Sequence, residues 1–249
     1  MAEPPHPDVP GAVESAIDRR VAHFATRLGA ASADPEYLLT RTFLDRVEFF
    51  TSFPRRAIDM GREGLFLPPA TCYRLFQSLP GTNFPEPTAV TLTGPCFRRE
   101  SRYDRGRRLA FTMREIVFLG NESSVAEARD ATSRASLRLA RRLGLEARLE
   151  EAEDPFFTTA GRGKRILQRL LRLKLELVAP VAGDPLALAS FNLHQDFFGT
   201  RLEITVEGRP AWTGCAAWGM ERWRLAIESR WGPTTSEWPG EARHALGLP

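Results

Sequence analysis

Residues 96–100 read Cys-Phe-Arg-Arg-Glu, residues 109–120 read LAFTMREIVFLG, and an arginine-rich loop, SRYDRGRR, lies between them. Both segments alternate in polarity and carry β-branched or aromatic residues, which predicts the two strands of a hairpin. Alternate residues of 109–119 share one face of the second strand, and five of these six residues are apolar. Glu115 is the sixth, so we expect a buried carboxylate there, which needs a cation or several hydrogen-bond donors.

The first strand also places charge on a face that would normally be apolar, because Arg98 and Glu100 share the side of Cys96. A structural Arg–Glu pair across the hairpin would explain one such pair equally well. The loop adds positive charge through Arg102, Arg105, Arg107 and Arg108. Charged residues on inward faces beside such a loop indicate a site for an anionic ligand.

The chain has 249 residues, enough for one large domain with a full hydrophobic core. We expect a disordered, proline-rich lead over residues 1–11 and a single domain over residues 12–249. No apolar run has membrane-spanning length, and the first residues lack the pattern of an export signal, so we expect a cytoplasmic protein. The net charge of +3 gives no bulk signature of nucleic-acid binding.

Apolar periodicity predicts the remaining elements. Helices are expected over residues 13–28, 36–50, 72–79 and 122–143, and strands over residues 64–69, 173–181, 186–195 and 201–207. The alternating strands favour an antiparallel sheet. One stripe of the 122–143 helix carries arginines, which form either a solvated face or a dock for an acidic partner. These are Arg134, Arg138 and Arg141, with Arg142 beside them.

The sequence FRRE (97–100), followed by the arginine loop and by F-x-x-x-E (111–115), resembles motif 2 of the class II aminoacyl-tRNA synthetases, in the seryl branch. The sequence GMER (219–222) opens a helical pattern that resembles motif 3 of the same class. The ordered pair, about 120 residues apart, is far more specific than either motif alone, and the resemblance covers roughly residues 35–232. It implies an α+β domain with a six- or seven-stranded antiparallel sheet flanked by helices, and a homodimer.

Motif 1 of this class forms the dimer interface, and residues 36–54 lie where motif 1 would be. An ordinary surface helix explains those residues equally well. No long antiparallel helical arm precedes them, whereas ordinary seryl synthetases hold their tRNA with such an arm. We therefore expect no tRNA substrate.

Three cysteines without an export signal indicate thiols or metal ligands rather than a disulfide framework. A lone cysteine is most often a small core residue, which would explain Cys72 by itself and is expected of Cys96. By the resemblance, Cys72 stands where the seryl family has a substrate-contacting glutamate, Glu115 is the motif 2 glutamate, and Cys215 precedes motif 3. This order resembles the zinc site of the seryl synthetases of methanogenic archaea and of the amino acid:[carrier protein] ligases. Zn²⁺ in such a site keeps an open position for the amino group of the substrate.

Three further segments resemble the carrier-protein ligases: DPFF (154–157), the glycine-rich GRGK (161–164) and SFNLHQD (190–196). They are a more specific signal than the arginine stripe. Within the last segment, Asn192 and His194 would lie near the substrate. A buried structural histidine explains His194 equally well.

The resemblance also assigns three arginines to the reaction. Arg98 would bind the α-phosphate of ATP and the attacking carboxylate through its planar guanidinium. Arg222, at the start of a helix, would hold the γ-phosphate, and Arg105 would assist from the loop. Positioning and charge stabilisation by Arg98 and Arg222 would be the main catalytic contribution of the protein.

Other residues would bind the nucleotide and its metal. Glu100 would accept a hydrogen bond from the adenine amino group, and Phe111 would stack on the adenine ring. Glu176 belongs to a strand that borders the nucleotide in this class. Mg²⁺ would bridge the phosphates of ATP, but Leu186 occupies the place of a metal-binding glutamate, so one expected magnesium contact is missing.

The resemblance therefore implies an enzyme that activates a small amino acid, glycine or alanine, as an aminoacyl-adenylate. The activated amino acid would pass to the phosphopantetheine thiol of a carrier protein. One alternative is a ligase with a small-molecule acceptor, and another is a non-catalytic synthetase paralogue that binds nucleotide or protein. The presence of Arg98, Glu100 and Arg222 argues against the paralogue, because a decayed site should lose them first.

Overall fold

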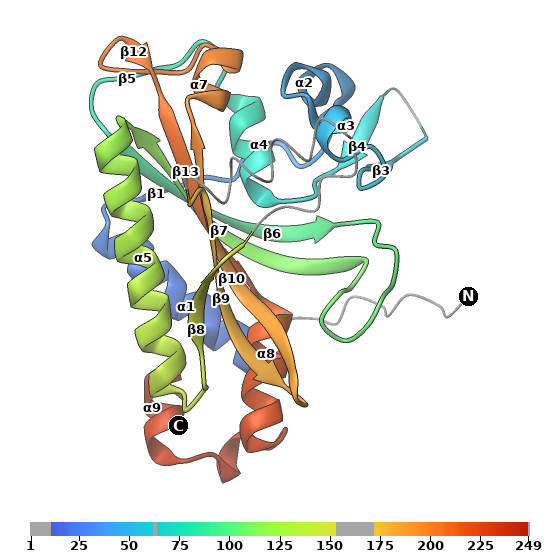
Figure 1. Cartoon of the computed structure of the whole chain (residues 1–249), viewed down its shortest axis with the longest axis vertical. Helices are drawn as coiled ribbons and strands as arrows, with labels where there is room; N and C mark the ends of the chain where they lie inside the picture. Colours follow the sequence, from blue (N-terminus) through green and yellow to red (C-terminus); the bar gives the residue numbers. More distant parts are fainter. Residues whose placement is uncertain (1–10, 62–63, 153–171, 249) are drawn as a thin grey trace.

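The computed structural model describes residues 11–61, 64–152 and 172–248 of the chain. The expected lead lies almost entirely outside these residues, and so do the DPFF and GRGK segments. A seven-stranded sheet, in the order β1-β6-β7-β13-β10-β9-β8, forms the centre of the fold (Figure 1). None of the described helices is long and apolar enough to cross a membrane.

Every neighbouring pair in the large sheet is antiparallel except the edge pair β1 and β6, so the expected antiparallel sheet is confirmed. In spatial order its strands are β1 (Ala31–Ser32), β6 (Thr88–Phe97), β7 (Ala110–Gly120), β13 (Trp212–Gly219), β10 (Asp184–Gln195), β9 (Lys174–Val181) and β8 (Arg148–Glu151). Two small sheets accompany it: β2 (Leu39–Thr40), β4 (Leu65–Leu67) and β3 (Ile58–Asp59), and β12 (Arg209–Pro210), β11 (Thr205–Val206) and β5 (Asn83–Phe84).

Helices cover both faces of the large sheet. One face carries α1 (Ala12–Arg27), α5 (Glu122–Arg142), α8 (Met220–Trp231) and α9 (Gly240–Leu246), with the short helix η1 (Thr235–Glu237) before α9. The other face carries α2 (Arg41–Arg46), α3 (Phe49–Ser52), α4 (Thr71–Ser78) and α7 (Phe197–Leu202). Strand β7 separates two cores, because Ile116 and Phe118 point to the α5 side whereas Val117 and Leu119 point to the α4 side.

The β6–β7 hairpin forms as predicted, but the first strand is shorter than its pattern indicated. β6 ends at Phe97, before residues 98–100 that were included in the strand, and β7 begins one residue later than predicted. The backbone N–H of Arg99 donates to the carbonyl oxygen of Arg56 at 3.2 Å instead of pairing with β7. The N–H of Arg98 still donates across the hairpin to the carbonyl of Leu109 at 2.9 Å, so the chain leaves the hairpin at Arg99, whose N–H bonds to another segment.

The strand predicted over residues 201–207 is wrong. Helix α7 continues to Leu202, Glu203 ends it in the left-handed region at φ 56°, and only the two residues of β11 are extended. Phe198 and Leu202 are four residues apart and both are buried, so they form one apolar face of a helix. This helical spacing outweighs the alternation of Leu202, Ile204 and Val206.

The single helix predicted over residues 36–50 is also wrong, because the segment forms strand β2 and then the short helices α2 and α3. The side chain of Thr40 caps α2 by accepting a hydrogen bond from the backbone N–H of Phe43 at 3.2 Å. Glu48, at φ 51°, interrupts the helical path between α2 and α3. These residues therefore do not form the long interface helix that the resemblance suggested for them.

Candidate active site

A cavity of about 260 Å³ lies between the β6–β7 loop, α4, β10, β13 and the start of α8. Every residue that the sequence placed in the site lines this cavity. These residues are Cys72, Arg98, Glu100, Arg105, Phe111, Glu115, Glu176, Asn192, His194, Cys215 and Arg222. Side chains that are far apart in the sequence thus converge on one site.

Two thiols and a carboxylate meet in the cavity. The ligand atoms of Cys72, Glu115 and Cys215 all lie within 4.8 Å of one another, and the three side chains are buried. Glu115 on β7 pairs with Ala217 on β13, two residues from Cys215, so Glu115 and Cys215 point to the same face. Cys72 comes from the first turn of α4. Two sulfurs and one carboxylate form a donor set that suits Zn²⁺.

The carboxylate of Glu115 is 1% exposed and is held through one oxygen. Its Oε1 accepts hydrogen bonds from Thr71 Oγ1 at 3.0 Å and from the backbone N–H of Cys72 at 3.2 Å, whereas Oε2 has no hydrogen-bond partner in the described chain. Burial raises the pKa of Glu115 to about 7, the charge of Cys215 adds to the rise, and the hydrogen bonds from Cys72 and Thr71 oppose it. Burial separates Oε2 from water, and a metal ion beside this oxygen would compensate for the lost hydration.

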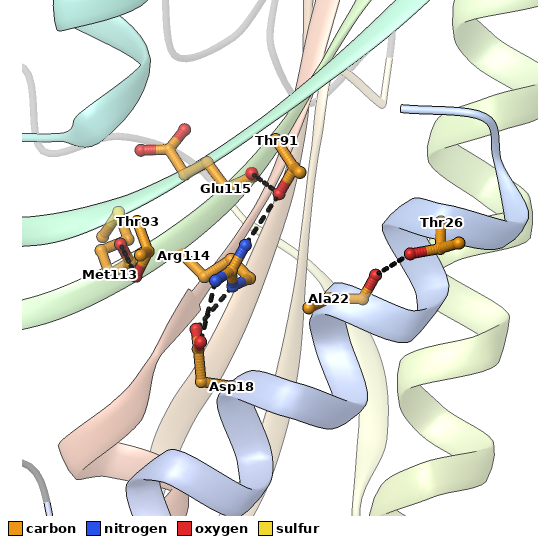
Figure 2. Close-up of polar contacts among 8 residues, drawn as sticks. All are labelled: Asp18, Ala22, Thr26, Thr91, Thr93, Met113, Arg114 and Glu115. Carbon is orange, nitrogen blue, oxygen red and sulfur yellow. Dashed lines mark hydrogen bonds and ion pairs between the residues drawn. The ribbon is translucent and has the colours of Figure 1, made fainter. Parts of the chain in front are cut away.

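Figure 2 shows the carboxylate of Glu115 and the side chain of Arg114 on opposite faces of β7. Arg114 contacts the two carboxylate oxygens of Asp18 on α1 at 2.5 and 2.8 Å, and it donates to Thr91 Oγ1 at 3.2 Å. The side chain of Arg114 therefore lies on the face of β7 that packs on α1. The Arg–Glu pair considered from the sequence does not account for Glu115, whose carboxylate faces the cavity.

Hydrogen-bond donors surround the sulfur of Cys215. Asn192 lies directly opposite on β10 and donates through Nδ2 at 3.4 Å, and His194 Nε2 lies 3.6 Å from the same sulfur. The pKa of Cys215 is lowered, first because the thiol of Cys72 donates to it and then because His194 and Asn192 stabilise the thiolate. The pKa of Cys72 is raised, first because it donates that hydrogen bond and then because it is buried. The cluster thus favours a thiolate at Cys215.

Two arginines of the motifs are fixed to backbone carbonyls at the cavity. Arg98 donates through Nε to the carbonyl of Pro69 at 2.7 Å, and its guanidinium lies over the Phe111 ring, 5.1 Å from the centroid. Arg222 donates through Nε to the carbonyl of Gly106 at 2.8 Å, and burial lowers its pKa. Both cations are therefore preorganised, which is what stabilisation of developing charge requires.

Two of the other carboxylates that line the cavity each lie beside a cation. Glu100 lies 3.5 Å from Nη2 of Arg56, and Glu176 lies 3.2 Å from Nζ of Lys174. Both glutamates are partly exposed, with 19% and 27% of their side chains accessible. They are thus open to a ligand that enters the cavity.

Leu186, which stands where the seryl family has a metal-binding glutamate, packs on the arginine loop. A Cβ added to Gly106 would lie 2.7 Å from Leu186 Cδ1, so a larger residue at position 106 would displace this side chain. The carbonyl of Gly106 is also the acceptor for Arg222. Position 186 therefore supports the loop and does not restore the missing magnesium contact.

The sequence did not single out two residues that hold site carboxylates, Thr71 and Arg56. Thr71 could have been found, because it precedes Cys72 at the start of the helix that was expected there. Arg56 gave no signal, since it meets Glu100 only through the loop that follows α3. Strand β13 was also missed, although it carries Cys215 into the centre of the sheet.

No protein-family model matches the sequence. The chain is 37% identical over 190 residues to amino acid--[acyl-carrier-protein] ligases 1 and 2 of Bradyrhizobium diazoefficiens, a match that covers 74% of this chain and 58% and 57% of those proteins. It is 29% identical over 188 residues to the type-2 serine--tRNA ligase of Methanocaldococcus jannaschii, which covers 70% of this chain and 36% of that protein. The chain thus spans less than two thirds of the length of these curated relatives.

Solved structures of similar fold include seryl-tRNA synthetases. M. kandleri SerRS, solved in complex with A. aeolicus tRNASec, superposes with a TM-score of 0.77 at 19% identity, over 96% of this chain and 57% of that chain. The cytoplasmic serine-tRNA ligase of Naegleria fowleri, in complex with AMP, superposes with a TM-score of 0.74 at 16% identity, over 94% and 52% of the two chains. The expected class II fold and the resemblance to the carrier-protein ligases are both confirmed.

Proposed function

We propose that this chain, which folds as the catalytic core of a class II synthetase and is similar in sequence to amino acid--[acyl-carrier-protein] ligases, activates a small amino acid and loads it onto a carrier protein. One observation carries this proposal: a single cavity holds both the thiol–carboxylate cluster and the arginines of the two motifs. The cluster would bind the amino group of the substrate. The arginines would bind its carboxylate and the phosphates of ATP.

Cys72, Glu115 and Cys215 would hold Zn²⁺. The unpartnered Oε2 of Glu115 and the lowered pKa of Cys215 both support this donor set. Bound zinc would supply an open coordination position for the α-amino group. The proposed preference for glycine or alanine follows from the resemblance to the carrier-protein ligases; His194 and Phe198, whose ring centroids lie 5.1 Å apart, line the same cavity.

Arg98 and Arg222 would carry the adenylation step. A carboxylate oxygen of the amino acid attacks the α-phosphorus of ATP, and the bond to pyrophosphate breaks. Arg98 would stabilise the charge on the α-phosphate and the attacking carboxylate, while Arg222 and Arg105 would hold the departing phosphates. Positioning and charge stabilisation are sufficient, because this reaction needs no covalent enzyme intermediate.

The rest of the nucleotide would be bound by residues around the arginine loop. Glu100 would accept a hydrogen bond from the adenine amino group, and Phe111 would stack on the ring. Glu176 would border the nucleotide, and Mg²⁺ would neutralise charge on its phosphates. The lining of the cavity by these three side chains supports their assignment.

In the second step, the phosphopantetheine thiol of a carrier protein would attack the carbonyl carbon of the adenylate. A thioester would form and AMP would leave, so no catalytic cysteine is needed. The names of the Bradyrhizobium relatives support a carrier protein as the acceptor. We further propose that the enzyme works as a homodimer in the cytoplasm and does not charge tRNA.

The test of the first step is ATP–pyrophosphate exchange with the purified protein and a panel of amino acids. We expect exchange that depends on glycine or alanine. If none of the amino acids supported exchange, the chain would be a non-catalytic paralogue. If only large amino acids supported exchange, the proposed substrate would be wrong.

Thr71 offers a sharper test of the proposed metal site, because its hydroxyl orients the carboxylate of Glu115 without touching the ion. We expect Thr71→Val to lower zinc affinity about 10- to 100-fold, the usual effect of removing a group that orients a metal ligand. Thr71→Ser keeps the donor and should bind zinc nearly as the unchanged protein does. Competition against a chromophoric chelator measures this directly, and equal affinity in Thr71→Val would contradict the assignment.

A further inference from the structure

A second groove lies on the opposite face of the large sheet from the candidate active site, between α1 and α5, and Ala245 of α9 also lines it. Its volume is about 460 Å³. Both α1 and α5 contact α9, which lies next to the end of α5 in Figure 1. The groove contains none of the residues assigned to amino-acid activation.

Apart from Thr132, the residues that line the groove are apolar or basic, and we call the apolar set its floor and the basic set its walls. Phe24, Leu28, Ala131, Ala135, Leu139 and Ala245 supply the floor. Arg20, His23 and Arg27 of α1 and Arg138 and Arg142 of α5 supply the walls. No carboxylate is among the described residues that line it, and Leu28 is 39% exposed, which is unusual for a large apolar side chain of this protein.

Only part of the arginine stripe predicted from the sequence lines this groove. All four of its arginines are exposed on α5, but only Arg138 and Arg142 line the groove, whereas Arg134 and Arg141 do not. Arg138 and Arg142 are four residues apart, so they project from the same side of the helix. The sequence could not show that this side faces the arginines of α1.

We infer that the groove is a docking site for an acidic amphipathic helix of a protein partner. An α-helix with side chains is about 10–12 Å wide and places apolar residues along one stripe, which an apolar floor between two helices can receive. Carboxylates on its flanks would meet arginines on both walls, where charge complementarity sets orientation and specificity. The docking site is independent of the reaction proposed above.

Two other occupants fit the groove less well. A second copy of the chain related by a two-fold axis would bring the same basic walls close to one another, and like charges repel. A nucleic-acid backbone would use the arginines but would leave Phe24 and Leu28 against charged phosphates. The combination of apolar floor and basic walls therefore favours a helix that is itself apolar on one side and acidic on the other.

The probe for this inference is a fluorescein-labelled helical peptide of about 18 residues, with leucines on one face and glutamates on the other. The paired variants are Arg138→Glu with Arg142→Glu, which changes the groove, and Arg134→Glu with Arg141→Glu, which changes the same helix outside it. We expect the first pair to weaken binding at least about tenfold and the second pair to change it less than about twofold. A scrambled peptide of equal charge should bind at least about tenfold more weakly than the amphipathic one.

Equal losses in the two paired variants, or equal binding of the scrambled peptide or of a short RNA duplex, would overturn the inference in favour of unspecific charge attraction. Sedimentation of the unlabelled protein supplies the remaining check. A dimer that the Arg138→Glu, Arg142→Glu pair dissociates would instead assign the groove to a second copy. ATP–pyrophosphate exchange should be the same in both pairs, because neither lines the active-site cavity.

Discussion

Arg98→Ala should lower amino-acid-dependent ATP–pyrophosphate exchange about a thousand-fold or more, the scale expected when a charge clamp of the transition state is removed. The structure supports an effect of this size, because Arg98 is anchored through Nε to Pro69 and directs its guanidinium into the cavity. Unfolding temperature and circular dichroism should stay close to those of the unchanged protein.

Arg99→Ala is the matched control for this variant. Arg99 is the next residue, its side chain is exposed and it does not line the cavity. Its contact with Arg56 is made by the backbone N–H, which the substitution keeps. Exchange should therefore be nearly unchanged in Arg99→Ala. If the two variants lost activity equally, or if Arg98→Ala kept activity within about tenfold of the unchanged protein, Arg98 would not be the clamp.

Cys215→Ala should release the proposed zinc ion and with it the activation of the amino acid. The unchanged protein should contain about one zinc per chain, because three protein ligands with one open position form a complete site of the catalytic type. Removing Cys215, whose sulfur Asn192 and His194 contact, leaves Cys72 and Glu115 alone, too few to keep the ion. Elemental analysis after dialysis against a mild chelator measures the content.

Cys96→Ala separates loss of the site from loss of a buried thiol in general. Cys96 is fully buried, like the cluster, but it packs with Met113 and Ala217 and is not part of the metal group. Its variant should keep the zinc and lose only packing energy. A fully active protein without metal, or equal zinc loss in both variants, would remove zinc from the proposed reaction.

Most of the site was predicted through the resemblance to the class II synthetases, and Glu115 also followed from a short-range rule. The period of two along β7 put Glu115 on a buried face, and motif order brought Arg98 and Arg222 to the same cavity. Features that depend on contacts between distant segments were harder to predict. The segment that forms β13 is buried on both faces, so it lacks the alternation that marks a strand.

Strand ends, helix boundaries and strand registers were predicted least well, and single residues show why. The sequence does not indicate that the backbone N–H of Arg99 donates to the carbonyl of Arg56, so the first strand was predicted too long. The interruption at Glu48 depends on a left-handed backbone that this residue type rarely adopts. The contact of His194 with Cys215 follows a register shift in β10, which the alternating pattern cannot indicate.

The most direct test of the proposed function supplies labelled glycine or alanine and ATP together with three acceptors in separate reactions. The acceptors are a phosphopantetheinylated carrier protein, the same carrier without its phosphopantetheine arm, and tRNA. We expect label on the first carrier alone, bound as a thioester that hydroxylamine releases. Label on tRNA, or on no carrier although the adenylate forms, would contradict the account.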